Sequence, residues 1–523
     1  MPQQQLIQLI ISLIFSSLAA VLLTLCSIKI LQILQLSGYK TKGVYTWLKR
    51  TRFDYQKRYL ALGFFSYVTA FMLIMSFPYH WANLFGFSFF IALSIFFIVL
   101  QVRQKQKTKL VYTNRIIRLS IALSILYFAL GFVLVYFLFE TIKGYSLISI
   151  LPLFIPIITV LAHLIMLPLE MLIGKMFFNK ANNKLDNAKD LIKIGISGSY
   201  GKTTTKNILA VLLSEKYKVL SSPKSFNTPM GLSKIINEND LTRFDVFIAE
   251  MGAKRTGEIQ ELCEFIKPKF GIVTKTGPQH LETFLTLDNA VDTEFSLAKH
   301  VKELVVLNTL DELVMQRADC IKNAVFVGVD AVYSNEKITE NGTEFDLKIG
   351  EESIKIITVL LGRHIPEVFS QAALLAYKMG VGPSDIERLA KDIKPVKHRL
   401  ELIKTPNGVV LDDAYNSNPD GAKNALEVLS CFEGTKVVIT PGFIELGTIE
   451  DEENYKLGQN AANIVDYLLV IKNEHIAKGA LDSGLNQEKI INVDSLDVAI
   501  EQLAKLQLQK QAVLFLNDLP DNY

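Results

Sequence analysis

Cysteine is scarce in this sequence. Its 523 residues include only four, Cys26, Cys263, Cys320 and Cys431, and these are scattered along the chain. None has the spacing of a metal-ligand set or of a disulfide framework, so a reducing compartment is the default expectation. The net charge is also small, at +3, and gives no reason to expect nucleic acid as a partner.

Charged residues are missing from long stretches of the first third of the chain. Five apolar runs precede residue 175, and each approaches the about 20 residues that a helix needs to cross a bilayer. They are roughly Leu6–Leu34, Tyr59–Phe77, Ala82–Val102, Leu119–Phe139 and Ser146–Leu172. Buried core helices, the alternative, would carry more polar interruptions, and the first run lacks the flanks of a signal peptide. We therefore expect a multi-pass helical membrane region over residues 1–178, with the lipid bilayer as a partner.

Lysine and arginine alternate from one connection to the next. The connections after the first and third runs are rich in both, whereas those after the second and fourth hold one at most. Because basic loops stay on the cytoplasmic side, this pattern predicts an N-terminus outside, five crossings and a C-terminal part in the cytoplasm. His163 is the one ionisable residue placed mid-span, and helix packing accounts for it better than a proton relay.

A glycine-rich loop organises the rest of the chain. It follows a polar segment, 179–190, which we interpret as a linker, and an apolar run, 191–196. The order of strand, glycine loop, lysine, hydroxyl and helix is typical of nucleotide phosphate binding, because backbone N–H groups and a helix N-terminus face the anion. The common pattern has a glycine where Ile196 stands, so an ordinary strand-to-helix turn is the alternative. The loop residues expected at the phosphates are Gly198, Ser199, Gly201, Lys202, Thr203 and Thr204.

Two more polar side chains follow predicted strands. The apolar run 244–249 ends at Glu250, and the run 270–274 is followed shortly by His280. In open α/β sheets, ligands bind at the carboxyl ends of the parallel strands, so Thr203, Glu250 and His280 are placed for one metal site. A surface glutamate and a structural histidine are the plainer interpretations of the two residues taken singly.

Strand and helix patterns continue to the end of the sequence. Residues 343–361 alternate apolar and polar, which predicts a hairpin with Gly350 at its turn. From residue 396 to 523, strands and helices alternate, which predicts a second parallel α/β domain. We therefore divide the region after the linker into a central domain, 191–395, and a C-terminal domain, 396–523.

Seven segments together resemble the Mur ligases, a family of peptidoglycan peptide ligases, and most of all its D-alanyl-D-alanine-adding members. The resemblance covers about residues 193–523. The matching segments are 198–205 (GSYGKTTT), 226–231 (FNTPMG), 250–259, 280–282 (HLE), 305–308 (VVLN), 398–401 (HRLE) and 412–420 (DDAYNSNPD). The resemblance implies a P-loop central domain and a Rossmann-like C-terminal domain.

The resemblance also implies an activity. Mur ligases use ATP and Mg²⁺ to activate a carboxylate as an acyl phosphate, which an amine such as D-alanyl-D-alanine then attacks. Lys202 would hold the phosphates, and Thr203, Glu250 and His280 would bind magnesium. The nucleotide-binding set would also include Asn308, Arg399, Asp413 and Tyr415. The substrate-binding set would be Asn227, Thr228, Asn416 and Asn418.

Plainer structural roles stand beside some of these assignments. Asn308 is also suited to a strand-end turn, and the segment 412–419 to an Asx-rich turn that caps a helix. Glu294 stands where many Mur ligases carry a carbamylated lysine. Since a carbamate is a carboxylate on a lysine stem, we expect Glu294 to supply the same charge, with a shorter reach, as a catalytic residue.

The identity of the substrates stays open at this stage. Two C-terminal segments, 440–447 and 516–523, depart from the family pattern and leave the amine undetermined. The membrane region stands where soluble Mur ligases carry the domain that binds the uridine-diphosphate sugar. The acceptor would then be a nucleotide-linked cell-wall precursor, with the membrane as an anchor, or a lipid-linked one. A third hypothesis is a non-catalytic membrane nucleotide sensor, against which Lys202, Thr203, Glu250 and His280 argue.

Overall fold

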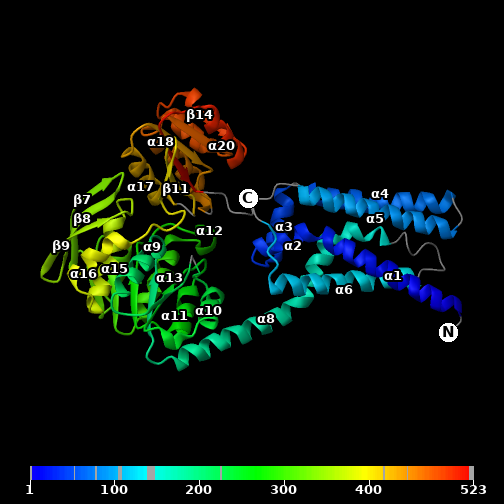
Figure 1. The fold of residues 1–523 in the computed structure, drawn as a ribbon, viewed down its shortest axis with the longest axis horizontal. Coiled ribbons are helices and arrows are strands. Elements are labelled where there is room, and N and C mark those ends of the chain that lie inside the picture. The colour runs from blue at the N-terminus through cyan, green and yellow to red at the C-terminus, as the bar shows by residue number, and fades with distance from the viewer. Residues whose placement is uncertain are drawn as a thin grey trace. The chain divides into compact units, whose positions relative to one another are not determined.

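The computed structural model divides into two compact units between Lys175 and Met176 (Figure 1). It describes residues 3–51, 54–76, 79–103, 109–137, 148–223, 226–415, 418–444 and 446–517.

The N-terminal unit is helical. Its elements are α1 (Gln3–Cys26), α2 (Ile28–Leu36), α3 (Thr41–Arg50), α4 (Asp54–Ser76), α5 (Tyr79–Arg103), α6 (Asn114–Phe137), a 3-10 turn (Leu151–Phe154) and the start of α8 (Ile155–Asn187). Within the described residues, four segments are long and apolar enough to cross a membrane, namely Gln5–Cys26, Phe85–Arg103, Asn114–Tyr136 and Leu151–Asn187. The second predicted run lies on α4, which is not among the four, and its last residue, Phe77, lies outside the described residues. Five membrane crossings therefore stay a prediction.

The first apolar run is two helices and not one. α1 ends at Cys26 and α2 begins at Ile28. The Ser27 hydroxyl donates back to the Leu23 carbonyl at 2.7 Å. The Cys26 carbonyl accepts from the Tyr59 hydroxyl at 3.2 Å and from the Gln101 side-chain amide at 3.0 Å. These side chains provide hydrogen-bond partners for the backbone where the helix is interrupted. The apolar pattern of the sequence did not indicate this interruption.

α8 continues through most of the segment expected to be a linker. It is a single helix to Asn187, and Phe178, Ala181 and Leu185 pack in the apolar core of the central domain. Their spacing of three and four residues places them on one helix face, while Asn179, Lys180 and Asn183 are exposed. Because the segment is polar on average, its sequence did not indicate this apolar helix face.

The central domain is built on a nine-stranded sheet in the order β2-β3-β1-β4-β5-β6-β7-β8-β9, parallel from β2 to β7 and antiparallel beyond. The strands are β1 (Ile192–Ser197), β2 (Val219–Ser221), β3 (Val246–Glu250), β4 (Phe270–Val273), β5 (Leu304–Asn308), β6 (Ala324–Val327), β7 (Ala331–Thr339), β8 (Gly342–Ile349) and β9 (Glu352–Thr358). The predicted hairpin is confirmed: Ile349 pairs with Glu352 across Gly350, whose φ is +61°.

Helices cover both faces of this sheet, which is why β1 and β3 are apolar almost throughout. α9 (Lys202–Leu213), α15 (Ile365–Lys378) and α16 (Pro383–Leu389) contribute to the core on one face. The other face packs against the end of α8 and against α10 (Pro229–Glu238), α11 (Glu258–Ile266), α12 (Leu281–Phe284), α13 (Leu287–His300) and α14 (Glu312–Ala318).

The C-terminal domain has the second parallel α/β fold that the sequence predicts. Its sheet has the order β10-β11-β15-β12-β13-β14, and only β10 is antiparallel. The strands are β10 (Glu401–Thr405), β11 (Gly408–Asp413), β12 (Thr435–Thr440), β13 (Tyr467–Ile471), β14 (Ile490–Val493) and β15 (Gln511–Leu516). The helices are α17 (Pro419–Ser430), α18 (Glu450–Ala462), α19 (Glu474–Asp482) and α20 (Leu496–Lys505).

Polar contacts join the central and C-terminal domains. The Lys275 ammonium lies 2.7 Å from an Asp420 carboxylate oxygen, and the Arg363 N–H donates to the Asn424 side chain at 2.6 Å. The His364 ring lies 3.1 Å from the same asparagine, and desolvation lowers the pKa of His364 to about 4. These contacts join the segments after β4 and before α15 in the central domain to α17 in the C-terminal domain.

The end of α8 generates a testable prediction about stability. Leu185→Ala should cost about 2–4 kcal/mol, because the side chain is 2% exposed in the central core. Thermal unfolding of the full chain in detergent would measure this as a lower midpoint for the ligase domains. Leu172→Ala, at a position 56% exposed on the same helix, is the matched control. Equal midpoints for the two variants would contradict the packing described here.

Candidate active site

The glycine loop lies between the central strand β1 and α9. Gly198 has a φ of +126°, and a Cβ there would come within 2.1 Å of the Thr274 hydroxyl. Glycine is therefore required at this turn. The N–H groups of Ser199 and Tyr200 both donate to the Lys275 carbonyl at 3.0 Å, which fastens the loop to the end of β4. Gly201 has a φ of +82° and directly precedes α9, which begins at Lys202.

The Lys202 side chain folds back over this loop. Its ammonium donates to the Gly198 carbonyl and, at 3.3 Å, to the Ser199 carbonyl. The ammonium must leave these carbonyls to reach a phosphate group. The arrangement thus provides a lysine close to the N-terminus of α9 whose present partners are neutral and replaceable.

Thr203 and Glu250 meet, as the strand-end argument predicts. Parallel pairing of β1 with β3 sets Ile196 opposite Glu250. The Thr203 hydroxyl lies 3.0 and 3.1 Å from the two carboxylate oxygens of Glu250. Their oxygen atoms are the donor type that Mg²⁺ prefers.

Lys206 is a site residue that the sequence analysis missed. Its ammonium lies 2.9 Å from Oε2 of Glu250, and the two side chains are 1% and 2% exposed. Lys206 follows Thr203 by three residues, so both lie on the same face of α9. That spacing on the buried face was the available signal, but a lysine on a helix usually indicates a solvated surface.

Glu294 also lies at the glycine loop. Its Oε2 accepts a hydrogen bond from the Gly198 N–H at 2.8 Å, and its backbone carbonyl accepts from the Ser197 hydroxyl at 2.7 Å. Burial raises the pKa of the Glu294 carboxyl to about 7, opposed by the positive charge of Lys202. The predicted residue is thus in the site, in contact with the loop backbone.

His280 lies in the segment that follows β4. It comes seven residues after the end of β4 and begins α12 with a φ of +52°. Within the described residues, no three histidine, cysteine, aspartate or glutamate side chains form a group that could hold a metal ion. Thr203 Oγ1 and the Oε1 atom of Glu250 fit a Mg²⁺ ion, since Lys206 engages Oε2. The role of His280 as a third ligand stays a prediction.

The predicted substrate loop, 226–228, packs beside the segment that follows Glu250. The Asn227 carbonyl accepts from the Gly252 N–H at 3.0 Å, and a Cβ on Gly252 would meet the Asn227 side-chain nitrogen at 2.5 Å. The Thr228 hydroxyl accepts from the Gly231 N–H at 3.2 Å and so caps the N-terminus of α10. The loop therefore contacts Gly252, which follows Glu250 by two residues.

Asn308 has the geometry of a strand-end turn. Its side-chain oxygen accepts from the Leu310 N–H at 3.0 Å, and its amide donates to Glu367 at 2.7 Å. The side chain is 1% exposed, and burial raises the pKa of Glu367. The plainer structural role is present, and contact with a nucleotide stays a prediction.

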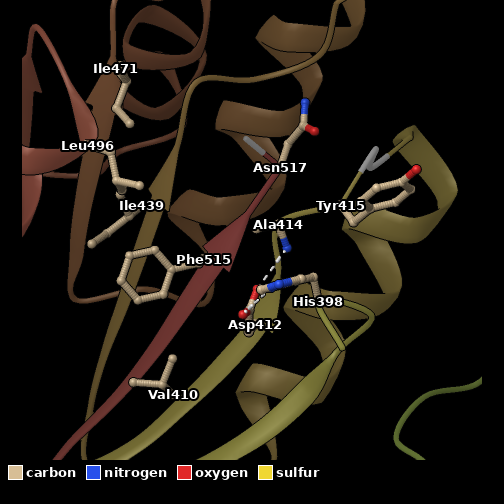
Figure 2. A pocket seen from close by; sticks show the side chains of 10 residues that line it. All are labelled: His398, Val410, Asp412, Ala414, Tyr415, Ile439, Ile471, Leu496, Phe515 and Asn517. Carbon is tan, nitrogen blue, oxygen red and sulfur yellow. Dashed lines mark hydrogen bonds and ion pairs between the residues drawn. The ribbon is translucent and has the colours of Figure 1, made fainter. Parts of the chain in front are cut away.

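The C-terminal domain holds a pocket of about 390 Å³ at the carboxyl ends of its strands (Figure 2). Apolar side chains form much of the wall, namely Val410, Ile439, Ile471, Leu496 and Phe515. The polar lining includes His398, whose ring lies 2.7 Å from an Asp412 carboxylate oxygen. In Figure 2, Asp412 and His398 lie beside each other, a dashed line joins Asp412 to Ala414, and Phe515 and Ile439 lie on the other side.

The remaining predicted C-terminal residues surround this pocket or cap α17. Arg399 lies over the Tyr415 ring at 4.6 Å. Asp413 accepts from the Leu400 N–H at 3.1 Å, and burial raises its pKa to about 7 while Arg399 opposes this. Asn418 accepts from the Gly421 N–H at 2.8 Å, so its expected capping role is confirmed. Asn416 lies outside the described residues.

A glycine loop on a central parallel strand, with a lysine and a hydroxyl–carboxylate pair, defines a phosphate-binding α/β protein. Residues 196–371 match the Mur ligase middle domain, and residues 398–516 match the Mur ligase, glutamate ligase domain. The two matches together span more than half of the chain. The chain therefore belongs to the Mur ligase family.

Individual relatives carry a consistent name. The chain is 29% identical to a UDP-N-acetylmuramoyl-tripeptide–D-alanyl-D-alanine ligase of Bacillus subtilis, over 51% of this chain and 59% of the relative. The corresponding figures for the Escherichia coli enzyme of that name are 26%, 56% and 67%. The chain thus spans about three fifths of the B. subtilis relative.

Solved structures share the fold. MurF from Acinetobacter baumannii superimposes with a TM-score of 0.60 at 22% identity, over 66% of this chain and 77% of that one. MurF from Thermotoga maritima in complex with ADP gives a TM-score of 0.58 at 25% identity, over 66% and 80%. The Mur ligase fold of the central and C-terminal domains is therefore confirmed.

Glu294 predicts a pH effect on stability. Because its folded-state pKa of about 7 lies above the ordinary 4.5, its contribution is fully present below pH 4.5 and is lost as the pH rises through 7. Glu294→Gln has no such loss. The unfolding midpoint of the variant relative to the wild type should therefore rise between pH 5 and pH 8. A difference that stays the same at both pH values would show that Glu294 does not titrate in this range.

Lys206 generates a prediction about the buried ion pair. Lys206→Met should destabilise the central domain by about 3–5 kcal/mol, because it leaves Glu250 buried without its cation. The double variant Lys206→Met/Glu250→Gln should recover much of that loss in the same denaturation assay. Arg388→Met, which breaks a surface pair with Glu215, is the control and should change little. Additive losses in the double variant would contradict the pairing.

Proposed function

We propose that this chain is an ATP-dependent ligase of peptidoglycan precursor synthesis. It would activate the carboxylate of a cell-wall precursor as an acyl phosphate and join it to D-alanyl-D-alanine or a similar small amine. The observation that carries the proposal is the arrangement of Thr203 and Lys206 on Glu250 beside the Lys202 loop. The names of the B. subtilis and E. coli relatives supply the reaction.

The phosphate chemistry follows from the residues around the loop. Lys202 and the N–H groups at the start of α9 would bind the β- and γ-phosphates of ATP. Lys206 pairs with the Glu250 carboxylate and orients it, so that Thr203 and Glu250 can hold a magnesium ion. Bound there, magnesium would neutralise charge that develops on the transferred phosphoryl group.

Bond making proceeds in two steps. The acceptor carboxylate attacks the γ-phosphorus of ATP and forms the acyl phosphate, with ADP as the leaving group. The amine then attacks the acyl carbon and forms the amide bond, and phosphate and a proton are released. The pocket at Asp412 suits the amine, since its carboxylate would attract an ammonium group and its apolar wall would accept methyl groups.

We also propose that the N-terminal helices anchor the ligase to a membrane, with the catalytic domains in the cytoplasm and the N-terminus outside. Four described segments have sufficient length and apolarity, and the basic connections support the orientation. Eight residues separate Leu172, at the end of the last apolar run, from Ala181 in the central core. Even a fully extended chain would keep these two residues within about 30 Å.

This short tether favours a lipid-linked precursor as a second candidate acceptor. A ligase held near the bilayer surface would meet an acceptor in that surface more often than a freely diffusing one. Assays of the detergent-solubilised full chain with nucleotide-linked and lipid-linked acceptors, ATP, Mg²⁺ and D-alanyl-D-alanine would separate the two. The mass of the product identifies both partners.

Ligase activity requires phosphate release that depends on both the acceptor and the amine. Lys202→Ala should lower this release at least a hundredfold, because the variant loses the charge at the transferred phosphoryl group. Lys180→Ala, at an exposed position on α8, is the control and should retain activity. Phosphate release from ATP without either substrate, or ligation retained by Lys202→Ala, would contradict the proposed reaction. Nucleotide binding without any turnover would favour the sensor hypothesis.

A further inference from the structure

The last turns of α8 hold the C-terminal end of α10. The Lys184 ammonium donates to three backbone carbonyls there, those of Ile236 at 3.2 Å, Asn237 at 2.9 Å and Asn239 at 3.0 Å. An ammonium group has three N–H donors, so these bonds use all of them. Carbonyls at a helix end lack intrahelical partners, and a positive charge there is favourable to the helix dipole.

Two more contacts fix α8 against the same region. The Asn237 side-chain amide donates to the Phe177 carbonyl at 2.8 Å. The Phe178 ring packs on Phe265 of α11 with centroids 4.4 Å apart. Hydrogen bonds in both directions therefore join α8 to α10, and an aromatic contact joins α8 to α11.

The predicted substrate loop, 226–228, lies at the other end of α10. Thr228 caps the helix, and Asn227 lies against Gly252, two residues after Glu250. Leu232, Ile235 and Ile236 are buried in the core that α8 enters. Because α10 is a short, well-packed helix of ten residues, a displacement at its C-terminal end would be transmitted to the loop at its N-terminal end.

We propose that α8 positions the acceptor loop 226–228 through Lys184. Lys184 is a positioning residue: it acts on the loop through α10 and touches no substrate. The proposal rests on the proposed function and on the predicted substrate-binding role of this loop, which we assign to the acceptor. It gives the last helix of the apolar region a second role, since one continuous helix, Ile155–Asn187, both carries a candidate membrane span and sets the geometry of the acceptor side.

The test compares Lys184→Met with Lys184→Arg and with Lys180→Met, in the full chain in detergent. Lys184→Met should raise the KM for the acceptor about tenfold, because the loop is less well ordered, and should leave the KM for ATP within about twofold. Lys184→Arg keeps a charged donor and should restore most of the acceptor KM. Lys180→Met should match the wild type. A rise in both KM values together, or in neither, would overturn the proposal.

Hydrogen exchange separates this proposal from the proposed function. Peptides that cover 226–238 should exchange faster in Lys184→Met than in the wild type, with or without a known acceptor. If the wild type forms no ligated product, the proposed reaction fails, yet faster exchange would still support the coupling of α8 to the loop. Unchanged exchange would overturn the coupling whatever the activity. Asn237→Ala removes the second link and serves if Lys184→Met does not fold; it should have the same effects.

Discussion

The buried carboxylate of Glu250 is the constraint around which the catalytic half of this protein is arranged. A charge that is almost fully removed from water needs partners, and here α9 supplies both. Lys206 gives the compensating positive charge, and Thr203 gives a hydroxyl within 3.1 Å of each carboxylate oxygen. Glu250 is delivered to this position by β3, and the glycine loop that begins α9 by its neighbour β1. Strand pairing, helix placement and phosphate chemistry therefore depend on one another.

A second dependence runs from α8 to the substrates. The final turns of α8 belong to the central core. Lys184, Ala181 and Leu185 make the last helix of the N-terminal region a component of the ligase fold. α8 is one helix of 33 residues, and its last turns lie in that core.

Much of this organisation follows from the sequence by simple rules. The strand-end rule placed Thr203 beside Glu250, because β1 and β3 are parallel neighbours, and alternation located the hairpin at Gly350. For His280 the same rule gives a weaker expectation, because six residues lie between the end of β4 and the histidine. The roles of Lys206 and Lys184 could not be predicted from the sequence for a different reason. A lysine on a helix is normally solvated, and only the three-dimensional neighbours, a buried carboxylate and a helix end, show that these two are not.

Resemblance supplied what local physics could not. The resemblance located Glu294 at the site, while the structure shows that its carboxylate contacts the Gly198 N–H, a bond that no sequence pattern indicated. Lys202 was assigned to phosphates by resemblance and by motif, whereas its present contacts are with its own loop. The account therefore requires one definite rearrangement when nucleotide binds.

That rearrangement is open to direct observation. A structure of the full chain with a non-hydrolysable ATP analogue and Mg²⁺ would show the position of the Lys202 ammonium. The account predicts that it leaves the Gly198 and Ser199 carbonyls for the β- and γ-phosphates, while Lys206 stays on Glu250 and the metal lies beside Thr203. A nucleotide bound away from residues 198–204, or bound while Lys202 keeps its loop contacts, would contradict it.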